Sequence, residues 1–590
     1  MQNPLKQIPI GVDNFKEIIE REGYFVDKTL FIKDIIENIS KVILLTRPRR
    51  FGKTLNFSML KCFLEIPECR KLENEDKDYL YLFENLKISE DERFIKKNFG
   101  QYPVLNFSFK KIKANNWQDA EYLFKEEISR EYHRHSYLLD DDIIESSGIR
   151  KKYERIMNME GQIIEYTAAI ADLTKYLNKY YFKKHYNKKV IVLIDEYDTP
   201  LHYAKLNGYY NEMLNVMRAL MVDGMKSNNN LEKAIVTGIM KISQESIFSS
   251  FNNPEIATVN SKYCADQFGF TETEVLAMLK YYGLEQYQQT IQEWYNGYLF
   301  GNKTVIYNPW SILSFIKADD HLPKAYWINT GDTTLIKRCL QLDQVKGKEY
   351  IQKLYQGKTL EMEVEENIIY EDVFNNVDKA FSYLLHAGYL KARQSERGDE
   401  KFLLSIPNRE VATIYKNILK NWFTVEQKTN FFISDMFKHL LSMDIEKFEN
   451  DLGSLLLTVS SYYDTASVNR QIKMTAKREE TERFENFYHG LMLGLMVNIV
   501  DDYYIESNKE YGLGRPDIVI LPKDINKTGY IMEFKNVFVS SDKKVEDAAR
   551  EALEQIEEKK YEEGLKKTGV KKFIKIGLGF KGKEVKVEIN

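Results

Sequence analysis

The sequence has little cysteine and no long apolar run. Its 590 residues include only 4 cysteines, too few for a disulfide framework and not paired at zinc-ligand spacing, which fits a reducing compartment. Uncharged runs such as residues 304–316 are well short of the ~20 residues that a membrane-spanning helix needs. The first residues also lack the apolar core of a signal peptide. These absences predict a cytoplasmic protein with no membrane partner.

An excess of charge of one sign, internal repeats and low-complexity segments are absent too. The 84 Lys and Arg against 88 Asp and Glu leave a net charge of −4, which excludes a globally basic nucleic-acid binder but allows local basic patches. Hydrophobic residues at 43% and charged residues at 29% are ordinary for a folded protein. The length predicts about three or four domains.

Short, uniformly apolar runs predict a buried sheet in the first part of the chain. Helix-like stretches separate the runs, which is the pattern of a parallel sheet with helices on both faces. The runs lie at residues 41–46, 102–109, 189–195, 233–239 and 255–259. We therefore expect an α/β domain at residues 1–265, with a helical segment at its N-terminus.

Beyond residue 265 the pattern changes several times. Thr271 and Glu274 have the spacing of a capping box, and helical patterns without a further buried strand predict a helical lid at 266–345. A helix-like run followed by a polar turn and a strand-like run predicts a winged-helix-like module at 346–425, before a helical connector at 426–480. A separate α/β domain is expected at 481–590, with a helix at 481–500, strands at 517–521 and 530–535, a helix at 545–563, and strands at 572–580 and 584–589.

The first predicted strand runs into the segment RPRRFGKTL, residues 47–55. In it, GKT opens a helix, the context in which backbone N–H groups cradle phosphates, a lysine reaches the β and γ phosphates and a threonine binds Mg²⁺. The usual first glycine of such a loop would fall at Arg47, so this loop must enter differently. A chance GKT at a helix start is the alternative. The expected ATP-binding residues are Arg49, Arg50, Phe51, Gly52, Lys53, Thr54, Leu55 and Asp195.

A second motif supports nucleotide binding. The run at 189–195 ends in two acids, of which Asp195 would hold Mg²⁺ and Glu196 would polarise the attacking water. Buried strands also often end in solvated acids, yet the two motifs together and in this order favour nucleotide binding. Thr237, Lys241 and Ser243 follow a further strand where ATPases carry sensor residues, although ordinary strand-end polarity explains them equally well.

Acidic residues and a lysine converge in the expected C-terminal domain. Asp517 begins one strand, and Glu533 and Lys535 lie two apart on the next. This spacing places Glu533 and Lys535 on one face, while Phe534 enters the opposite, buried face. Asp517 and Glu533 could share Mg²⁺ or Mn²⁺, and Lys535 would orient the nucleophile or neutralise charge. The pattern predicts a catalytic site for phosphodiester cleavage.

Polar residues on two flanking helices are weaker candidates. Glu485 and His489 lie four apart and so share a helix face. Glu485 could be a further acid of the metal site, but helix solvation explains it equally well, and His489 fits a core edge better than a catalytic role. Gln555 and Lys559 also share a face and could touch a phosphate backbone, although a solvated face is the better interpretation.

Together these segments resemble a family of bacterial proteins in which an AAA-ATPase-like N-terminal domain precedes a C-terminal PD-(D/E)xK nuclease superfamily domain. The resemblance covers nearly the whole chain and includes RPRRFGKTL, LIDEYDTP, WYNGY, GRPDIVI and IMEFK. The loop form with Arg47 is a trait of this family. The resemblance implies a P-loop parallel sheet and a restriction-endonuclease-like α/β domain, with family motifs matched by Lys53, Thr54, Asp195, Glu196, Glu485, Asp517, Glu533 and Lys535.

The leading hypothesis is an ATP-binding and ATP-hydrolysing protein coupled to a Mg²⁺-dependent nuclease, with DNA as the favoured substrate. The alternative is a nucleotide-switched regulator that binds DNA or a protein and whose nuclease fold does not cleave. A pure ATPase motor is weaker, because no helicase signature accompanies the loop. The sequence leaves the oligomeric state open, a homo-oligomer included.

Overall fold

The chain forms two compact units in a computed structural model, Met1–Thr413 and Ile414–Asn590, and their boundary falls within helix α18 (Arg409–Trp422). In the part of the chain that is described, no helix is long and apolar enough to cross a membrane. The structure describes residues 4–67, 69, 78–140, 144, 146–183, 188–242, 254–327, 344–355, 357–368, 373, 376–395, 401–422, 429–459, 488, 489, 492, 493, 495, 496, 499, 502–507, 509–537 and 542–590.

A five-stranded parallel sheet forms the core of the first unit, in the order β2-β3-β4-β1-β6. Each strand lies on one of the apolar runs, so the sequence prediction of a parallel sheet is confirmed. Because β4 lies between β1 and β3, the carboxyl ends of these three adjacent parallel strands lie along the same side of the sheet. The strands are β1 (Val42–Thr46), β2 (Val104–Ser108), β3 (Val190–Asp195), β4 (Leu231–Gly238) and β6 (Glu255–Ala257).

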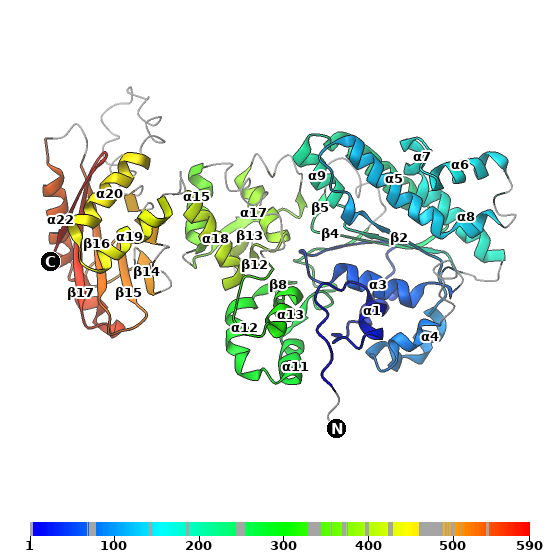
Figure 1. Cartoon of the computed structure of the whole chain (residues 1–590), viewed down its shortest axis with the longest axis horizontal. Coiled ribbons are helices and arrows are strands. Elements are labelled where there is room, and N and C mark those ends of the chain that lie inside the picture. Colours follow the sequence, from blue (N-terminus) through cyan, green and yellow to red (C-terminus); the bar gives the residue numbers. More distant parts are fainter. Residues whose placement is uncertain are drawn as a thin grey trace. The chain divides into compact units, whose positions relative to one another are not determined.

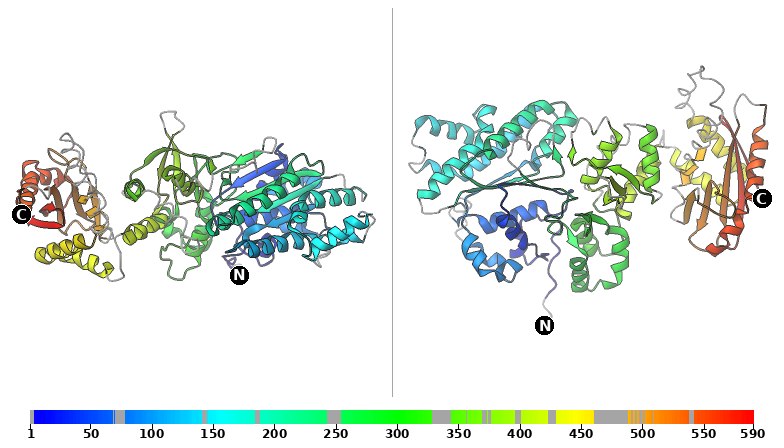
Figure 2. Two further views of the ribbon diagram at one scale, coloured as in Figure 1. Left: turned by 90° about the horizontal axis from the view of Figure 1, so that it is seen from above. Right: turned by 180° about the vertical axis from the view of Figure 1, so that it is seen from behind.

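Helices cover both faces of this sheet (Figure 1; Figure 2 shows the same layers from two other sides). One layer contains α1 (Phe15–Glu20), α3 (Lys53–Leu64) and α4 (Glu92–Asn98). The opposite layer contains α5 (Trp117–Arg134), α6 (Ser147–Met157), α7 (Ile163–Thr167), α8 (Ala169–Lys183) and α9 (Thr199–Asn207). Helix α10 (Tyr210–Met225) packs against α8, and α2 (Leu30–Glu37) against α3.

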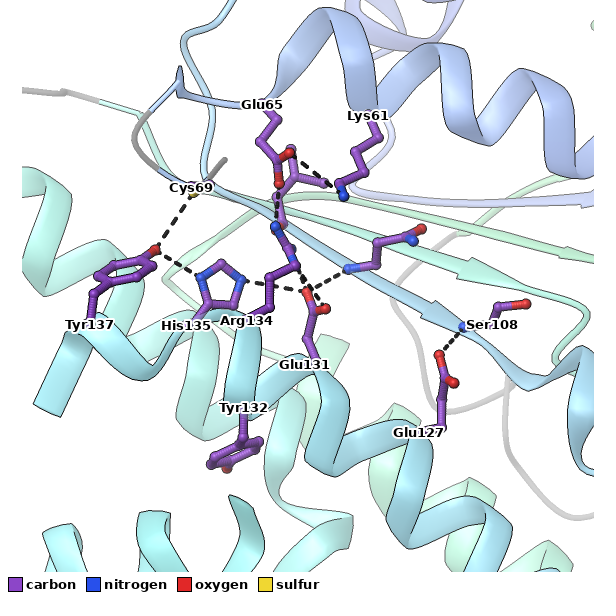
Figure 3. A network of polar contacts seen from close by, with 12 residues as sticks. Lys61, Glu65, Cys69, Ser108, Glu127, Glu131, Tyr132, Arg134, His135 and Tyr137 are labelled. Carbon is purple, nitrogen blue, oxygen red and sulfur yellow. Dashed lines mark hydrogen bonds and ion pairs between the residues drawn. The ribbon is translucent and has the colours of Figure 1, made fainter. Parts of the chain in front are cut away.

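Side chains of α5 take the place of a further strand at the free edge of β2 (Figure 3). Glu131 Oε1 accepts a hydrogen bond from the backbone N–H of Asn106 at 2.9 Å, and Glu127 Oε1 accepts one from Ser108 N–H at 2.7 Å. The two carboxylates are one helical turn apart and the two amides two residues apart, so the spacings match. The outward-facing backbone N–H groups of Asn106 and Ser108 on β2 are therefore hydrogen-bonded and unavailable to a strand of another chain.

The same helix fixes the far end of α3. Arg134 Nη1 donates to Glu65 Oε1 at 2.5 Å, and Glu65 directly follows α3 as its C-cap. Burial alone would raise the pKa of Glu131, but the Arg134 guanidinium and His135 bring it below its usual range. His135 Nδ1 lies 2.8 Å from the Tyr137 hydroxyl, which extends the network into the core (Figure 3). Because α3 carries Lys53 at its other end, this buried network holds the helix that follows the loop of residues 47–52.

The segment after the sheet begins as predicted and then departs from the prediction. The capping box is present: Thr271 N–H donates to Glu274 Oε2 at 2.8 Å, at the start of α11 (Glu272–Tyr282). The expected absence of strands is wrong, because β7 (Phe270–Thr271), β8 (Tyr298–Phe300) and β9 (Thr304–Tyr307) form an antiparallel sheet. These strands have two to four residues, too short to show a period of their own. Helices α12 (Gln288–Tyr295) and α13 (Pro309–Lys317) complete this segment.

The last segment of the first unit contains the predicted helix and hairpin. Helix α17 (Val377–His386) is followed by the antiparallel pair β12 (Lys391–Gln394) and β13 (Lys401–Ser405). Strand β10 (Leu360–Glu363) pairs with the other side of β13, and α15 (Gln344–Tyr355) precedes it. Short strands β5 (Lys241–Ile242) and β11 (Asn367–Ile368) pair in parallel, which joins this segment to the end of β4.

A mixed five-stranded sheet, β14-β15-β16-β17-β18, forms the second unit. Only β16 and β17 are parallel. Apolar side chains of one face pack on α19 (Thr429–Leu441) and α20 (Ile445–Val459), and the other face packs on α22 (Val545–Glu558). Two glycines allow α22 to approach closely, since a Cβ on Gly577 would lie 2.2 Å from the Ala549 carbonyl oxygen. The strands are β14 (Tyr503–Ser507), β15 (Ile518–Pro522), β16 (Gly529–Asn536), β17 (Phe573–Lys581) and β18 (Glu584–Ile589).

Two details of this unit differ from the sequence prediction. Strand β14 was not predicted, because its YYIES sequence lacks clear alternation. The helix expected at 545–563 is interrupted: α22 ends at Glu558, Lys560 has a left-handed φ of 52°, and α23 (Tyr561–Leu565) follows. The helix expected at 481–500 lies largely outside the described residues.

Candidate functional site

The loop between β1 and α3 closes around the side chain of Lys53. Gly52 is the N-cap of α3 with φ 88°, a left-handed conformation that a glycine adopts without strain. Lys53 Nζ donates to the carbonyl oxygens of Arg47 and Pro48 at 2.9 and 3.0 Å. Burial lowers the pKa of Lys53, while the carboxylates of Glu196 and Asp195 oppose that shift. The ammonium is therefore buried beside both predicted acids.

Arg47, which stands where a glycine was expected, holds the start of the loop. Its side chain is fully buried, and its Nη1 donates to the carbonyls of Ala257 and Thr258 at 2.8 and 2.9 Å. Nη2 donates to the Cys264 carbonyl at 3.0 Å. Burial lowers the pKa of Arg47 to about 10, so the guanidinium keeps its charge at neutral pH. The loop enters through this buried cross-link to the end of β6 and not through a glycine turn.

Hydrogen bonds connect the start of α3 to the ends of β3 and β4. Thr54 Oγ1 donates to Asp195 Oδ2 at 2.7 Å, and Thr237 Oγ1 donates to Asp195 Oδ1 at 2.6 Å. The backbone N–H of Glu196 lies 3.4 Å from Thr237 Oγ1. Burial raises the pKa of Asp195, and the two threonine hydroxyls counteract that rise. The structure thus brings together the side chains of Thr54 and Asp195 and the backbone N–H of Glu196, with Thr237 between them.

Glu196 and Asp198 have different surroundings. Glu196 has a left-handed φ of 52°, which is strained for a residue with a side chain, and its Oε2 accepts from Thr199 Oγ1 at 3.0 Å. Asp198 is buried and its Oδ2 accepts from the Ile239 N–H at 2.7 Å. Burial raises the pKa of Asp198 to about 6. Asp198 therefore supports the chain after β4, whereas Glu196 is the partly exposed acid.

The other residues expected at the nucleotide site are less uniform. Arg49 and Leu55 are half-buried, and the exposed Arg50 has its guanidinium 4.2 Å from the centre of the Trp310 ring. The Phe51 side chain is buried against the Tyr298 ring, with centroids 5.0 Å apart, so only its backbone could contribute to a nucleotide site. Of the sensor candidates, Thr237 joins the hydrogen bonds above, Lys241 lies on β5, and Ser243 lies outside the described residues.

Sequence reasoning missed a lysine and several contacts of the loop. Burial lowers the pKa of Lys113, and the charge of Glu196 opposes that shift. The Lys113 ammonium therefore lies close enough to the Glu196 carboxylate for the two charges to interact. Trp327, Gly388 and Glu410 also lie at or next to the loop. In the sequence these three residues stand in polar or aromatic segments without a recognised motif. Nothing local in the sequence connects them with a loop some 280 or more residues earlier.

The two carboxylates predicted in the second unit are cross-strand neighbours. Strands β15 and β16 are antiparallel, with Ile518 opposite Met532, so Asp517 lies opposite Glu533. The Asp517 N–H lies 3.3 Å from Glu533 Oε2, and Asp517 Oδ2 accepts from the Phe534 N–H at 2.8 Å. Burial raises the pKa of Asp517. The pair is therefore held side by side by backbone contacts of one hairpin.

Residues around this pair come from β16, α22 and α23. Lys535 follows Glu533 on the same side of β16 and lowers the pKa of Asp517 by its charge, whereas Phe534 is buried on the opposite face, as predicted. Gln555 Nε2 donates to Glu533 Oε1. Tyr561 is also near, since the charges of Glu533 and Asp517 contribute to its raised pKa after burial.

Two further predicted residues have other surroundings. His489 Nε2 lies 3.0 Å from the Asp517 backbone carbonyl and 2.9 Å from Ser507 Oγ, so it holds the start of β15. The Lys559 backbone carbonyl accepts from the Leu513 N–H at 2.8 Å. Glu485 lies outside the described residues. Within the residues that are described, no group of three or more His, Cys, Asp or Glu side chains could hold a metal ion.

Comparisons with known proteins identify both domains. Residues 9–248 match the family model described as "Predicted AAA-ATPase", and residues 483–589 match the model of the PD-(D/E)XK nuclease superfamily. The "Uncharacterized protein in vnfD 5'region" of Azotobacter chroococcum mcd 1 is 25% identical over 571 residues, 94% of this chain and 93% of that protein. The Walker-type ATPase of Pyrococcus abyssi has 14% identity and a TM-score of 0.31, over 70% of this chain and 99% of that chain. A TM-score this low supports no conclusion about the fold of this chain.

The matches confirm the resemblance seen in the sequence motifs. The mixed α/β architecture with a parallel sheet and a second, mixed sheet agrees with it. The chain therefore combines an AAA-ATPase-like domain at residues 9–248 with a C-terminal domain of the PD-(D/E)XK nuclease superfamily at residues 483–589.

Proposed function

We propose that the protein binds and hydrolyses ATP at the loop of residues 47–54. The observation that carries this proposal is the hydrogen-bonded series from Thr54 through Asp195 and Thr237 to the Glu196 amide. It unites the start of α3 with the ends of β3 and β4, where a phosphate, a divalent cation and a water have to meet. Adenine is favoured over guanine, because the sequence contains no guanine-specificity motif.

The residues of this site have distinct roles in the proposal. An ammonium has three donors, and Lys53 uses two on loop carbonyls; among the described residues the third has no acceptor, and it would bind a phosphate oxygen. Thr54 and Asp195 would hold Mg²⁺, which supplies charge neutralisation for the β and γ phosphates when bound. The Glu196 carboxylate, with Oε2 held by Thr199, would orient the attacking water and accept its proton.

We propose further that the second unit cleaves phosphodiester bonds of nucleic acid, with DNA as the favoured substrate. The adjacent carboxylates of the half-buried Asp517 and the buried Glu533 suit a divalent cation, because a nearby positive charge would favour their ionised forms. They would hold Mg²⁺ or Mn²⁺, which supplies an activated water when bound. Lys535 would compensate negative charge near Asp517.

A test of the nucleotide site compares two hydroxyl deletions on α3. Thr54→Val removes the hydroxyl that binds Asp195, whereas Ser58→Ala, one turn further along, removes one that accepts from the Phe15 N–H. We expect Mg²⁺-dependent phosphate release from ATP in the wild type and in Ser58→Ala, and its loss in Thr54→Val. No hydrolysis by the wild type, or equal rates in all three, would contradict the proposal.

A test of the second site offers single-stranded DNA, double-stranded DNA and RNA to the full-length chain with Mg²⁺ or Mn²⁺, with and without ATP. We expect cleavage by the wild type. The control variant Asp524→Asn should also cleave, because Asp524 is an exposed acid in the turn of the same hairpin. Binding without cleavage in every condition would favour the alternative, a nucleotide-switched regulator.

A further inference from the structure

Residues from later segments of the first unit contact every position from Arg47 to Phe51. A Cβ on Gly388, which has φ +90°, would lie 2.9 Å from the Pro48 Cβ. The Arg49 carbonyl, the Arg50 guanidinium and the Phe51 ring each contact an aromatic side chain, of Trp327, Trp310 and Tyr298 respectively. The loop is thus enclosed by the segments that follow the sheet as well as by the sheet itself.

Trp327 makes the central contact of this enclosure. Its side chain is buried, and its indole Nε1–H donates to the Arg49 carbonyl at 3.1 Å. Its ring lies 5.0 Å from the Tyr389 ring and 6.2 Å from the Tyr298 ring, measured between centroids. One side chain therefore joins the phosphate loop to the turn after α17.

Glu410 holds the backbone of Trp327. Glu410 is fully buried, its Oε1 accepts from the Trp327 N–H at 2.6 Å and its Oε2 accepts from Ser311 Oγ at 2.7 Å. A buried carboxylate with both oxygens hydrogen-bonded fixes the groups that donate to it, because leaving either donor unpaired is costly. The indole is thereby kept in place from α13 and from the first turn of α18.

We propose that Trp327 is a positioning residue of the nucleotide site, which holds the Arg49 carbonyl and couples nucleotide binding at the loop to residues 376–395. The inference rests on the proposed binding of ATP at Lys53. Loop amides can point to a phosphate only if the carbonyls between them point away and are bound elsewhere, and the indole N–H binds one of them. A shift of the loop would reach Gly388 and Tyr389, because a Cβ on Gly388 would already lie 2.9 Å from the Pro48 Cβ and the Tyr389 ring packs beside the Trp327 ring.

The test compares Trp327→Phe with Trp294→Phe in the full-length chain. Phenylalanine keeps an aromatic ring beside Tyr389 but removes the N–H that binds Arg49. Trp294 packs in the core formed by α11, α12 and α13 and serves as the control. Two quantities are measured: the KM and kcat of ATP hydrolysis, and amide hydrogen exchange of residues 376–395 with and without ATP.

In the wild type and in Trp294→Phe, ATP should slow exchange in residues 376–395. In Trp327→Phe, that response should disappear, and KM should rise about fivefold with kcat nearly unchanged, the size expected for one lost hydrogen bond. A wild type that binds ATP without any change of exchange there overturns the inference and leaves the proposed function standing. So does a Trp327→Phe protein that keeps both the wild-type KM and the response. If the wild type binds no ATP, the proposed function itself fails.

Discussion

The two candidate sites differ in how far apart their parts lie in the chain. The carboxylate pair of the second unit comes from one hairpin, in which Asp517 and Glu533 are cross-strand neighbours. The loop of residues 47–54 contacts a side chain as distant as Trp327, which Glu410 holds in turn. A site within a hairpin is fixed by local register, whereas an enclosed loop depends on the packing of the whole first unit. Mutations at the hairpin site should affect only its immediate surroundings. Mutations around the enclosed loop should affect distant parts of the first unit.

The largest expected effect is at the hairpin site. Asp517→Asn keeps the shape of the side chain but removes a charge that would bind a cation, so nucleic-acid cleavage should fall about 1,000-fold. ATP hydrolysis should not change, because the contacts described for Asp517 all lie within the second unit. Gel-based cleavage and phosphate-release assays on the same preparation measure both rates. Equal loss of both activities would mean that the sites are not independent.

Glu196→Gln should lower kcat for ATP hydrolysis about 100-fold, since the amide cannot accept the proton of the attacking water. Nucleotide affinity should stay near wild type, because Lys53, Thr54 and Asp195 are untouched. Steady-state kinetics and equilibrium titration separate the two quantities. Glu212→Gln, at an exposed position of helix α10, provides the control. Wild-type turnover in Glu196→Gln would assign the catalytic role to another group.

Arg47→Met should destabilise the first unit by roughly 2–4 kcal/mol, because it leaves buried carbonyls at residues 257–264 without their charged donor. Arg50→Met, at the exposed position next to Trp310, should cost less than about 1 kcal/mol. Urea titration of the full-length proteins measures the difference. Equal midpoints for the two variants would refute the structural role given to Arg47.

These contrasts also show what the sequence could reveal. The five apolar runs and the spacing of Glu533 and Lys535 encode local geometry, so the parallel sheet and the shared face were predictable. The role of Arg47 was not, because its partners lie some 210 residues away and are backbone carbonyls, which any sequence supplies. Strands β7 to β9 and β14 escaped prediction because tertiary pairing, and not local periodicity, forms them.

The smallest expected effect is a pH dependence from Glu410. Burial raises the pKa of Glu410 to about 7, against 4.5 for a glutamate exposed to water. The folded state therefore binds the carboxyl proton of Glu410 more tightly than the unfolded state does. Its contribution to stability is complete below pH 4.5 and is lost as the pH rises towards 7, at most roughly 3 kcal/mol. Ser311, the N–H groups of Tyr326 and Trp327, and the phenol of Tyr295, whose pKa is raised, face this carboxyl.

Glu410→Gln should therefore flatten the fall in stability between pH 5 and pH 7. Urea midpoints at several pH values measure the slope, and Glu285→Gln, an exposed glutamate of the same unit, should retain the wild-type slope. The same slope in Glu410→Gln and the wild type would show that another group titrates.

The most direct test of the central claim is calorimetric titration of ATP with Mg²⁺ into the full-length wild type, Lys53→Ala and Lys61→Ala. Lys61 is in the last turn of the same helix and pairs with Glu65, so its loss controls for helix charge. We predict binding by the wild type and Lys61→Ala, and affinity at least about 100-fold weaker in Lys53→Ala. Unchanged affinity in a folded Lys53→Ala protein would contradict a nucleotide site at this loop.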